Sequence, residues 1–285
     1  MEMVHFIPPL QRRIALSAAQ ADAAPVLIYG GSGTGKGAIA RWIHDHGPRV
    51  SKPLITADKK LSLASQIPVA QGGTLVVPEI GEWPLGEQKT LLTYLSTRSI
   101  PHPENPQLRV LINTRIIATT DQALERRAEA GLFNGELLAK LNAHRLEMPP
   151  LAKRTEEFPD IVTGIIGEIS RELHKEHLKG LDPQVWDRLR AYEWPGNLRE
   201  LRNVLRVAVI STQTDHITEA DLPEFGNTRV DFKSTREDFE RLYILELLRT
   251  FDGQVDKACE STRIDKTTLL SKIKKYGITV KGDAP

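Results

Sequence analysis

The sequence is poor in cysteine, in aromatic residues and in long apolar runs. Cys259 is the single cysteine among 285 residues, which excludes an intramolecular disulfide framework and indicates a reducing compartment. The first residues, MEMVHFIPPLQRR, lack the apolar core of a signal peptide, and no later run reaches membrane-spanning length. We therefore expect a soluble, cytoplasmic protein that does not enter a membrane.

The net charge is also close to zero, because the chain has 38 basic and 37 acidic residues. Any affinity for nucleic acid must then come from a local cluster of basic residues. The close histidine pairs are His44/His46 and His174/His177, and no cysteine or carboxylate constellation supports a metal site at the second pair, which could share a helix face. We interpret them as ordinary solvated histidines and expect no metal site built from them.

Strand-like apolar runs alternate with helical patterns in the first half of the chain. The runs are VLIY at 26–29, TLVV at 74–77 and RIIATT at 115–120, and a helical pattern covers 86–98. This alternation predicts an α/β domain with a largely parallel sheet. After residue 151 the pattern becomes helical, with helices expected over 156–177, 182–194 and 195–211.

A glycine-rich segment, GGSGTGK, directly follows the first strand-like run and precedes a helical pattern. This order of strand, loop and helix is typical of a phosphate-binding loop, in which backbone N–H groups point at phosphate oxygens and Lys36 reaches the β and γ phosphates. The predicted phosphate-binding residues are Gly30, Gly31, Ser32, Gly33, Thr34, Gly35, Lys36 and Gly37.

Two positions depart from what magnesium chemistry requires. The residue after Lys36 is Gly37, which has no hydroxyl to ligate the metal. The stretch GGTLVVPEIGEW, at 72–83, ends its apolar run with Pro78 in place of an aspartate, followed by Glu79. Glu79 is the candidate catalytic residue, placed to orient or deprotonate an attacking water. We therefore expect nucleotide phosphates to bind while Mg²⁺ is held poorly.

Five motifs in one order carry a family resemblance: GGSGTGKGAIARWIH, GGTLVVPEIGEWPL, RIIATT, MPPL and WPGNLREL. Together they resemble the AAA+ domain of sigma-54-dependent transcriptional activators of the NtrC type, and the final segment resembles the Fis-type helix-turn-helix of that family. The resemblance covers about residues 5–278. It implies a P-loop α/β subdomain with a parallel sheet over 1–149, a helical lid over 150–223, a linker over 224–236 and an all-α helix-turn-helix domain over 237–285.

The resemblance also assigns roles to single residues. Gly30 to Lys36 match the Walker A loop, so the implied cofactor is ATP or ADP, and Arg199 matches the sensor II arginine that touches phosphates. Pro78 and Glu79 match the Walker B aspartate–glutamate pair, of which the glutamate is kept. The resemblance covers four further positions. Asp121 falls near the sensor I asparagine of the family, and Asp58 falls near an asparagine that restrains the glutamate. Asn134 and Lys140 stand at the positions of two trans-acting arginines. Lysine does not reproduce the planar fork of an arginine finger.

A segment of the family is missing from this chain. Members of the family carry a loop with a GAFTGA motif, which grips the sigma factor, between the segments that correspond here to KPLITAD and AQGGTL. This chain has KKLSLASQIPV there, at 59–69. The resemblance therefore implies that this chain has no means of passing mechanical work to sigma-54.

The C-terminal segment is locally basic, with six basic residues and one acidic residue between 262 and 281. Such an excess is the electrostatic footprint of a DNA contact. VDKACES followed by TRIDKTTLLSKIKKYGI predicts a helix-turn-helix, packed through Ala258, Ile264, Leu269 and Ile273. The residues expected to face double-stranded DNA are Lys266, Thr267, Thr268, Ser271, Lys272 and Lys275. A homodimer is expected through the helix at 235–251, by way of Phe239, Leu242, Leu245 and Leu248.

These observations favour a DNA-binding transcriptional regulator with a degenerate AAA+ domain that binds nucleotide and hydrolyses it poorly. Two alternatives remain open at this point. In the first, Asp58 or Asp121 restores metal binding, and the protein is an active ATPase that remodels another partner. In the second, the chain is a non-catalytic subunit that joins an active homologue. RNA polymerase is a further candidate partner.

Overall fold

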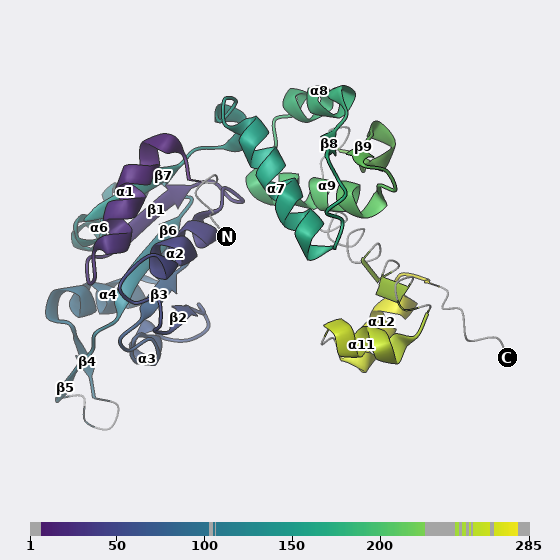
Figure 1. Ribbon diagram of the computed structural model, residues 1–285. Helices are drawn as coiled ribbons and strands as arrows, with labels where there is room; N and C mark the ends of the chain where they lie inside the picture. The colour runs from purple at the N-terminus through teal and green to yellow at the C-terminus, as the bar shows by residue number, and fades with distance from the viewer. Residues whose placement is uncertain are drawn as a thin grey trace. The chain divides into compact units, whose positions relative to one another are not determined.

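The computed structural model describes residues 7–102, 105, 107–225, 243–244, 247–248, 251, 253–262 and 265–278. The chain divides into two compact units, which are described separately below (Figure 1). The first unit comprises Met1–Phe158 together with Trp194–Arg199, and the second comprises Pro159–Glu193 together with Glu200–Pro285.

The first unit is built around a parallel five-stranded sheet with strand order β2-β3-β6-β1-β7. Its strands are β1 (Val26–Gly30), β2 (Leu54–Thr56), β3 (Thr74–Val77), β6 (Arg115–Thr120) and β7 (His144–Met148). Its helices are α1 (Pro9–Gln20), α2 (Lys36–Asp45), α3 (Leu63–Val69), α4 (Leu85–Thr97), α5 (Leu124–Glu129) and α6 (Gly135–Leu141), with short 3₁₀ turns η2 (Ile80–Glu82) and η3 (Leu151–Lys153). The predicted α/β architecture with a parallel sheet is confirmed.

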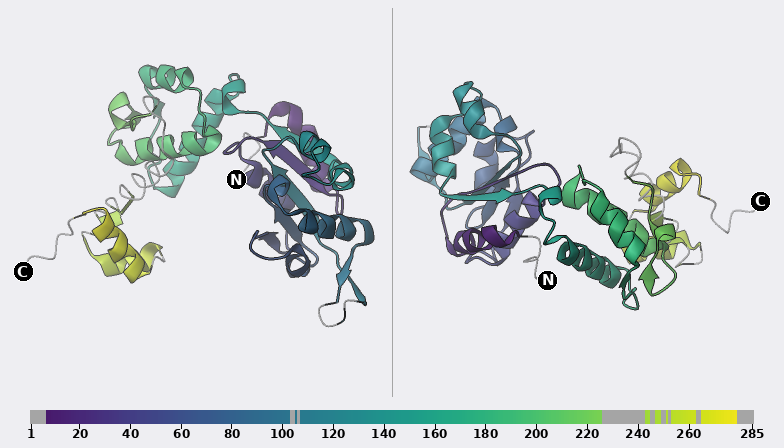
Figure 2. Two further views of the ribbon diagram at one scale, coloured as in Figure 1. Left: turned by 180° about the vertical axis from the view of Figure 1, so that it is seen from behind. Right: turned by 90° about the horizontal axis from the view of Figure 1, so that it is seen from above.

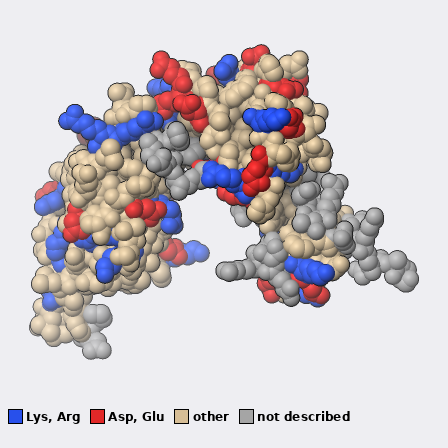
Figure 3. All heavy atoms as spheres, viewed as in Figure 1, with Lys and Arg blue, Asp and Glu red and all other residues tan. Residues whose placement is uncertain are grey.

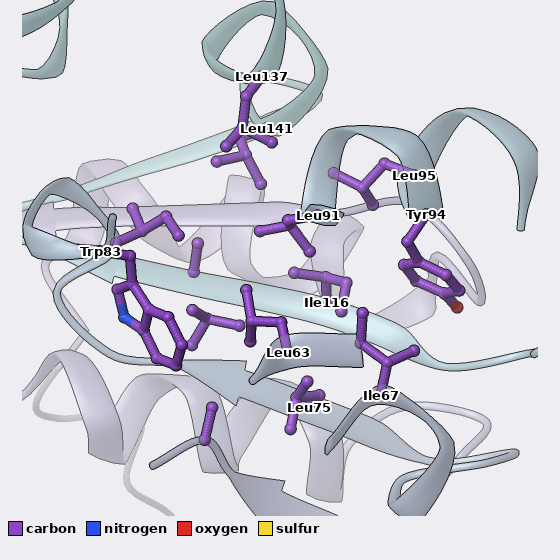
Figure 4. Packing of buried hydrophobic residues seen from close by; sticks show 14 of the residues in the cluster. Leu63, Ile67, Leu75, Trp83, Leu91, Tyr94, Leu95, Ile116, Leu137 and Leu141 are labelled. Atoms are coloured by element: carbon purple, nitrogen blue, oxygen red, sulfur yellow. The ribbon is translucent and has the colours of Figure 1, made fainter. Parts of the chain in front are cut away.

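Helices cover both faces of this sheet (Figures 1 and 2). On one face, α1 and α2 pack Ala15, Ile39 and Ile43 against strand residues such as Ile28 and Ile117. On the other face, α3, α4 and α6 pack onto the alternate residues of the same strands. The side chains of that second cluster include Leu63, Ile67, Leu75, Trp83, Leu91, Tyr94, Leu95, Ile116, Leu137 and Leu141 (Figure 4). Because both faces are covered, the central strands read as continuous apolar runs.

The sequence pattern did not reveal the two edge strands, β2 and β7. Each pairs with one neighbour only, and β7 (HRLEM) mixes charged and apolar residues. The proline-rich stretch 100–109 joins the arms of an antiparallel hairpin, β4 (Ser99–Pro101) and β5 (Arg109–Leu111). A strand that is stabilised mainly by pairing with a neighbouring strand, and less by burial of its side chains, shows little apolar pattern in its sequence.

The second unit contains α8 (Pro183–Ala191), the short strands β8 (Gly180–Leu181) and β9 (His216–Ile217) and the 3₁₀ turn η4 (Glu219–Asp221). It also contains α7 (Phe158–Glu172) and α9 (Asn197–Ser211), apart from their first residues, Phe158 and 197–199, which belong to the first unit. Helices α7 and α9 lie side by side (Figure 2) and are joined by ion pairs from Arg202 to Glu168 at 2.6 Å and from Arg206 to Glu172 at 2.5 Å. Helix α8 begins with Pro183 after the N-cap Asp182, whose side chain makes no capping hydrogen bond.

The C-terminal segment contributes α11 (Val255–Thr262) and α12 (Lys266–Lys275). Leu248, Ala258, Leu269 and Ile273 are buried together in a small apolar cluster between these helices and the preceding segment. Ile264 lies outside the described residues, as do residues 226–236 of the expected linker. Phe239, Leu242 and Leu245 of the expected dimer helix also lie outside them.

One expectation about the histidines is wrong. His44 is buried on α2, and its Nδ1 lies 3.0 Å from the hydroxyl of Thr74 on β3. Desolvation lowers the pKa of this imidazole, so that the neutral ring is favoured. The burial comes from the four-residue spacing that puts His44 on the same buried side of α2 as Ala40.

None of the described helices combines the length and the apolar character needed to cross a membrane. Cys259 is a free, half-buried thiol on α11. Trp42, Trp83 and Trp194 are buried packing residues, whereas Trp186 is half-buried on the surface of the second unit.

Candidate functional site

The phosphate-loop residues form a tight turn between β1 and α2. Gly30 ends β1, Lys36 begins α2, and Gly35 is the N-cap of the helix. Gly33 and Gly35 have φ values of 78° and 94°, in the left-handed region that glycine adopts without strain. The loop therefore leads into the N-terminus of a ten-residue helix, where free N–H groups and the helix dipole favour an anion.

Lys36 lies at the base of this loop, and its side chain is almost fully buried. Its ammonium donates to the carbonyl oxygen of Gly30 at 2.6 Å and lies 3.0 Å from Oε1 of Glu79. The cation expected to reach phosphate oxygens is thus held at the base of the loop by a carbonyl and a carboxylate.

Glu79 follows β3 in a strained conformation, with φ at 45°. Its backbone N–H donates to Oγ1 of Thr119 at 3.3 Å, and its Oε2 accepts the N–H of Asp121 at 2.8 Å. The structure therefore brings together Lys36 after β1, Glu79 after β3 and Asp121 after β6, at the carboxyl edge of three parallel strands.

The positions that would hold a metal fit Mg²⁺ poorly. Pro78 presents only its carbonyl oxygen, which accepts the indole N–H of Trp83 at 2.8 Å. Asp58 is exposed, and its carboxylate accepts the Lys60 N–H at 2.9 Å. Across the described part of the chain, no group of three or more histidine, cysteine, aspartate or glutamate side chains is arranged to hold a metal ion.

Gly37 leaves room that a side chain could fill, since a Cβ built there meets no atom within 4 Å. The lack of a hydroxyl at this position is therefore a property of the sequence, and the fold does not impose it. Gly30 is different, because a Cβ there would lie 2.5 Å from the carbonyl oxygen of Met148.

Residues 194–199 belong to the first unit and contact the phosphate loop directly. Arg199 donates its backbone N–H to the Gly33 carbonyl at 3.2 Å and its guanidinium to Oγ of Ser32 at 3.2 Å. Asn197 donates to the Ser32 carbonyl at 2.9 Å and accepts the buried N–H of Leu151 at 2.8 Å. Asn197 was missed at the sequence level, although it stands inside the WPGNLREL motif that indicated Arg199.

Asn134 and Lys140, at the positions of the family's trans-acting arginines, lie on α6. Asn134 is the N-cap of this helix, and its Oδ1 accepts the Leu137 N–H at 2.9 Å. Lys140 is exposed in the last turn, where a cation interacts favourably with the helix dipole. Both residues thus support the helix locally.

Helix α12 carries the residues expected to face DNA. Asp265 caps it by accepting the N–H groups of Thr267 and Thr268. Hydrogen bonding from the Thr267 side chain, followed by the backbone N–H of Thr268, holds the pKa of the Asp265 carboxyl below its usual value. Lys266 pairs with Asp256 on α11 at 2.5 Å, which raises the pKa of Lys266. Of the residues expected to face DNA, Lys266, Thr267, Thr268, Ser271 and Lys275 are exposed and Lys272 is half-buried; Leu270 and Lys274 of the same helix are exposed as well.

The described surface shows basic and acidic side chains intermixed on the visible face of both units (Figure 3). This agrees with the near-zero net charge of the chain. A nucleic-acid contact would consequently depend on a few side chains such as those of α12, and not on a broad positive surface.

Comparison with known proteins supports these assignments at the level of the family. A family profile described as the sigma-54 interaction domain matches residues 6–151, and a profile described as the AAA+ ATPase lid domain matches residues 152–238. The transcriptional regulatory protein ZraR of Escherichia coli is 31% identical over 95% of this chain and 68% of its own length. The alginate biosynthesis regulator AlgB of Pseudomonas syringae is 31% identical over 90% of this chain and 62% of its own length.

Solved structures give the same result. NtrX of Brucella abortus in complex with ADP matches 94% of this chain and 68% of its own chain, with 25% identity and a TM-score of 0.65. The ATP complex of the same protein matches with 26% identity and a TM-score of 0.62. The chain thus spans about two thirds of the length of these relatives. The two profiles together cover most of the chain, and it belongs to the sigma-54 interaction domain family of AAA+ transcriptional regulators.

Proposed function

We propose that this protein is a DNA-binding transcriptional regulator whose AAA+ domain binds ATP or ADP, hydrolyses ATP very slowly and does not remodel sigma-54 polymerase. The observation that carries this proposal is the environment of Glu79. It keeps the catalytic carboxylate beside Lys36 at 3.0 Å, while its neighbour Pro78 offers no carboxylate for the metal. Nucleotide then acts as a ligand that biases the conformation or assembly of the protein.

Nucleotide binding is supported by the loop geometry and by the relatives. The loop ends at the N-terminus of α2, and Arg199 lies close enough to Ser32 for a hydrogen bond of 3.2 Å. NtrX, which is similar over most of this chain, has been crystallised with ADP and with ATP. Lys36→Ala should abolish nucleotide binding, because it removes the cation at the base of the loop.

Slow turnover follows from three absences in the catalytic set. Pro78 cannot ligate magnesium, Gly37 has no hydroxyl, and Asn134 and Lys140 replace the arginines that would act in trans. An arginine finger alone contributes roughly 10³–10⁵ in rate. We expect magnesium-dependent hydrolysis to be slower by at least this order than in a fully equipped enzyme.

The test compares nucleotide binding and turnover in the same preparations. Fluorescent ATP should bind the wild-type protein almost equally with and without magnesium, and steady-state phosphate release should stay near background. Pro78→Asp should increase the magnesium dependence of binding, because it restores a carboxylate at the end of β3. Robust magnesium-dependent hydrolysis by the wild type, lost in Glu79→Gln, would refute the proposal and favour an active ATPase.

The inability to act on sigma-54 polymerase is inferred from residues 57–73. This connection between β2 and β3 contains α3, and it has no counterpart of the GAFTGA loop. In a purified system with this protein as sole activator, we expect no open complex at a sigma-54 promoter. An open complex formed there would contradict the inference. Regulation would instead act through another form of RNA polymerase or through repression.

DNA binding is assigned to α12, in a dimer formed through the segment that precedes α11. Lys272→Ala should weaken binding to all sequences and reduce the salt slope by about one unit, if this lysine neutralises a phosphate. Thr268→Ala should change sequence preference with little effect on the salt slope. Deleting 237–285 should abolish DNA binding and leave nucleotide binding intact. Unchanged DNA affinity of the truncated protein would overturn the assignment.

A further inference from the structure

A cavity of about 530 Å³ lies within the second unit. It is lined by α7, α8, β8 and β9 and by the segment that joins α7 to β8. Its volume falls inside the range of roughly 300–1,000 Å³ that is usual for small-molecule sites. We propose that this cavity binds a small, uncharged organic molecule with a ring-sized apolar body and one hydroxyl or amide group.

The apolar part of the lining defines where the body of such a molecule would lie. Ile166 on α7 and Leu181 on β8 are buried residues that line the cavity, and the half-buried indole of Trp186 joins them from α8. The guanidinium carbon of Arg190 lies 5.4 Å from the centre of the Trp186 ring, which holds the indole in place. Two aliphatic side chains and an aromatic ring favour contact with an aliphatic or aromatic ring.

One polar side chain of the lining is buried, whereas the others, among them Thr163 and His216, are exposed or half-buried, and this buried group defines the polar end. Ser170 is only 6% exposed, and its hydroxyl makes no hydrogen bond within the described part of the chain. A buried hydroxyl without a partner is costly, and a hydroxyl both donates and accepts. A ligand hydroxyl or amide reaching Ser170 would remove this cost.

The charges at the mouth balance each other. Arg171, Lys179 and Glu176 line the cavity, and Asp215 neutralises Lys179 through an ion pair of 2.7 Å. Arg171 donates its Nε–H to the Gly167 carbonyl at 2.9 Å. Two cations and two carboxylates leave no net field to attract an ion, which favours an uncharged ligand.

Two glycines keep the cavity open. A Cβ built on Gly167 or on Gly180 meets no atom within 4 Å, and both residues line the cavity. Gly167 lies inside a fifteen-residue helix, where glycine costs about 0.5–1 kcal/mol relative to alanine. Gly164 has the same open surroundings in the same helix but does not line the cavity, so it provides a matched control.

This proposal is independent of nucleotide turnover and of DNA binding, so its test uses the full chain without either ligand. The protein is labelled with 5-fluorotryptophan and titrated with benzyl alcohol while ¹⁹F NMR spectra are recorded. The four tryptophans give separate signals, and Trp186→Phe assigns the one at the cavity. We expect a saturable shift of the Trp186 signal, with the signals of the three buried tryptophans unchanged.

Variants then distinguish binding of benzyl alcohol in this cavity from non-specific contact of the alcohol with the protein. Gly167→Leu should fill the cavity and weaken binding more than ten-fold, whereas Gly164→Leu should leave it unchanged. Ser170→Ala should weaken binding of benzyl alcohol about three- to ten-fold and leave binding of toluene, which lacks the hydroxyl, unaffected. The Trp186 signal of the ligand-free protein and the urea transition of the second unit show whether each variant is folded, because the three buried tryptophans belong to the first unit.

The proposal is overturned if the Trp186 shift does not saturate or if all four signals shift. It is also overturned if Gly167→Leu and Gly164→Leu lose the same amount of affinity for benzyl alcohol. If Gly167→Leu does not fold, the same decision rests on Ser170→Ala, where an unchanged benzyl alcohol affinity overturns the assigned polar contact. Tighter binding of benzoate than of benzyl alcohol would contradict the uncharged ligand class.

Discussion

Replacing Gly33 with alanine tests whether residues 194–199 are held against the phosphate loop as the structure describes. Gly33 has φ at 78°, and a Cβ there would overlap the carbonyl oxygen of Gly196. Gly72 has nearly the same φ, 74°, but a Cβ there meets no atom within 4 Å. The two positions therefore share the cost of a left-handed alanine and differ in the steric overlap alone.

The magnitudes follow from these contacts. A left-handed alanine costs roughly 1–2 kcal/mol, which is partly offset by the reduced freedom of the unfolded chain, so Gly72→Ala should destabilise by about 1 kcal/mol. Gly33→Ala must also displace the Gly196 backbone, for about 1–3 kcal/mol of overpacking, and it strains the hydrogen bond from Arg199 to Gly33. We expect a total of about 2–5 kcal/mol.

Urea unfolding followed by tryptophan fluorescence measures both free energies of unfolding. Trp194 lies in the displaced segment and is 2% exposed, so its emission reports the first unit. Because the chain has two units, the transition of the first unit is fitted separately. If Gly33→Ala and Gly72→Ala lower the free energy of unfolding by amounts that agree within about 0.5 kcal/mol, the described contact is refuted. The cost of a left-handed alanine, which the two variants share, would then explain the whole destabilisation.

Two further predictions concern buried polar groups. Asn197→Ala should lower the free energy of unfolding of the first unit by about 1–3 kcal/mol in the same urea assay. The reason is that the buried N–H of Leu151 loses its acceptor and the carbonyl of Ser32 loses its donor. A decrease below about 0.5 kcal/mol would contradict this. His44 has a lowered pKa when folded, so its contribution to stability is complete above pH 6.5 and is lost as the pH falls through the folded pKa. His44→Gln keeps a partner for Thr74 and should reduce the loss of stability between pH 7.5 and about pH 5; equal losses in both proteins would refute it.

The phosphate loop was predictable because all of its parts are contiguous. A buried strand, a glycine-rich turn and a helix follow one another between residues 26 and 45, and local backbone geometry is enough to specify the turn. The sequence also showed that Gly37 and Pro78 differ from the residues that usually ligate magnesium, because each lacks the functional group needed at its position. The central strands were predictable from their continuous apolar runs, which occur because both of their faces are buried.

Other features depend on which segments meet in space. The contact of Lys36 with Glu79, and of Glu79 with Asp121, exists because β1, β3 and β6 are parallel and end at one edge of the sheet. Strand order is a long-range property that no local pattern encodes. The same reason explains why the edge strands β2 and β7 were missed, since each is stabilised by its partner and carries little hydrophobic periodicity of its own.

The role of Asn197 and the cavity beside Ser170 belong to the tertiary structure alone. The sequence places Asn197 in a motif, yet only folding brings its amide between the Leu151 N–H and the Ser32 carbonyl, residues 46 and 165 positions away. The sequence likewise contains Gly167 and Ser170 in a helical pattern, but the space in front of them is set by how α8, β8 and β9 pack against α7. Residue types and local turns were fixed by the order of amino acids, whereas partners and empty space were decided by packing, because packing depends on contacts between distant segments.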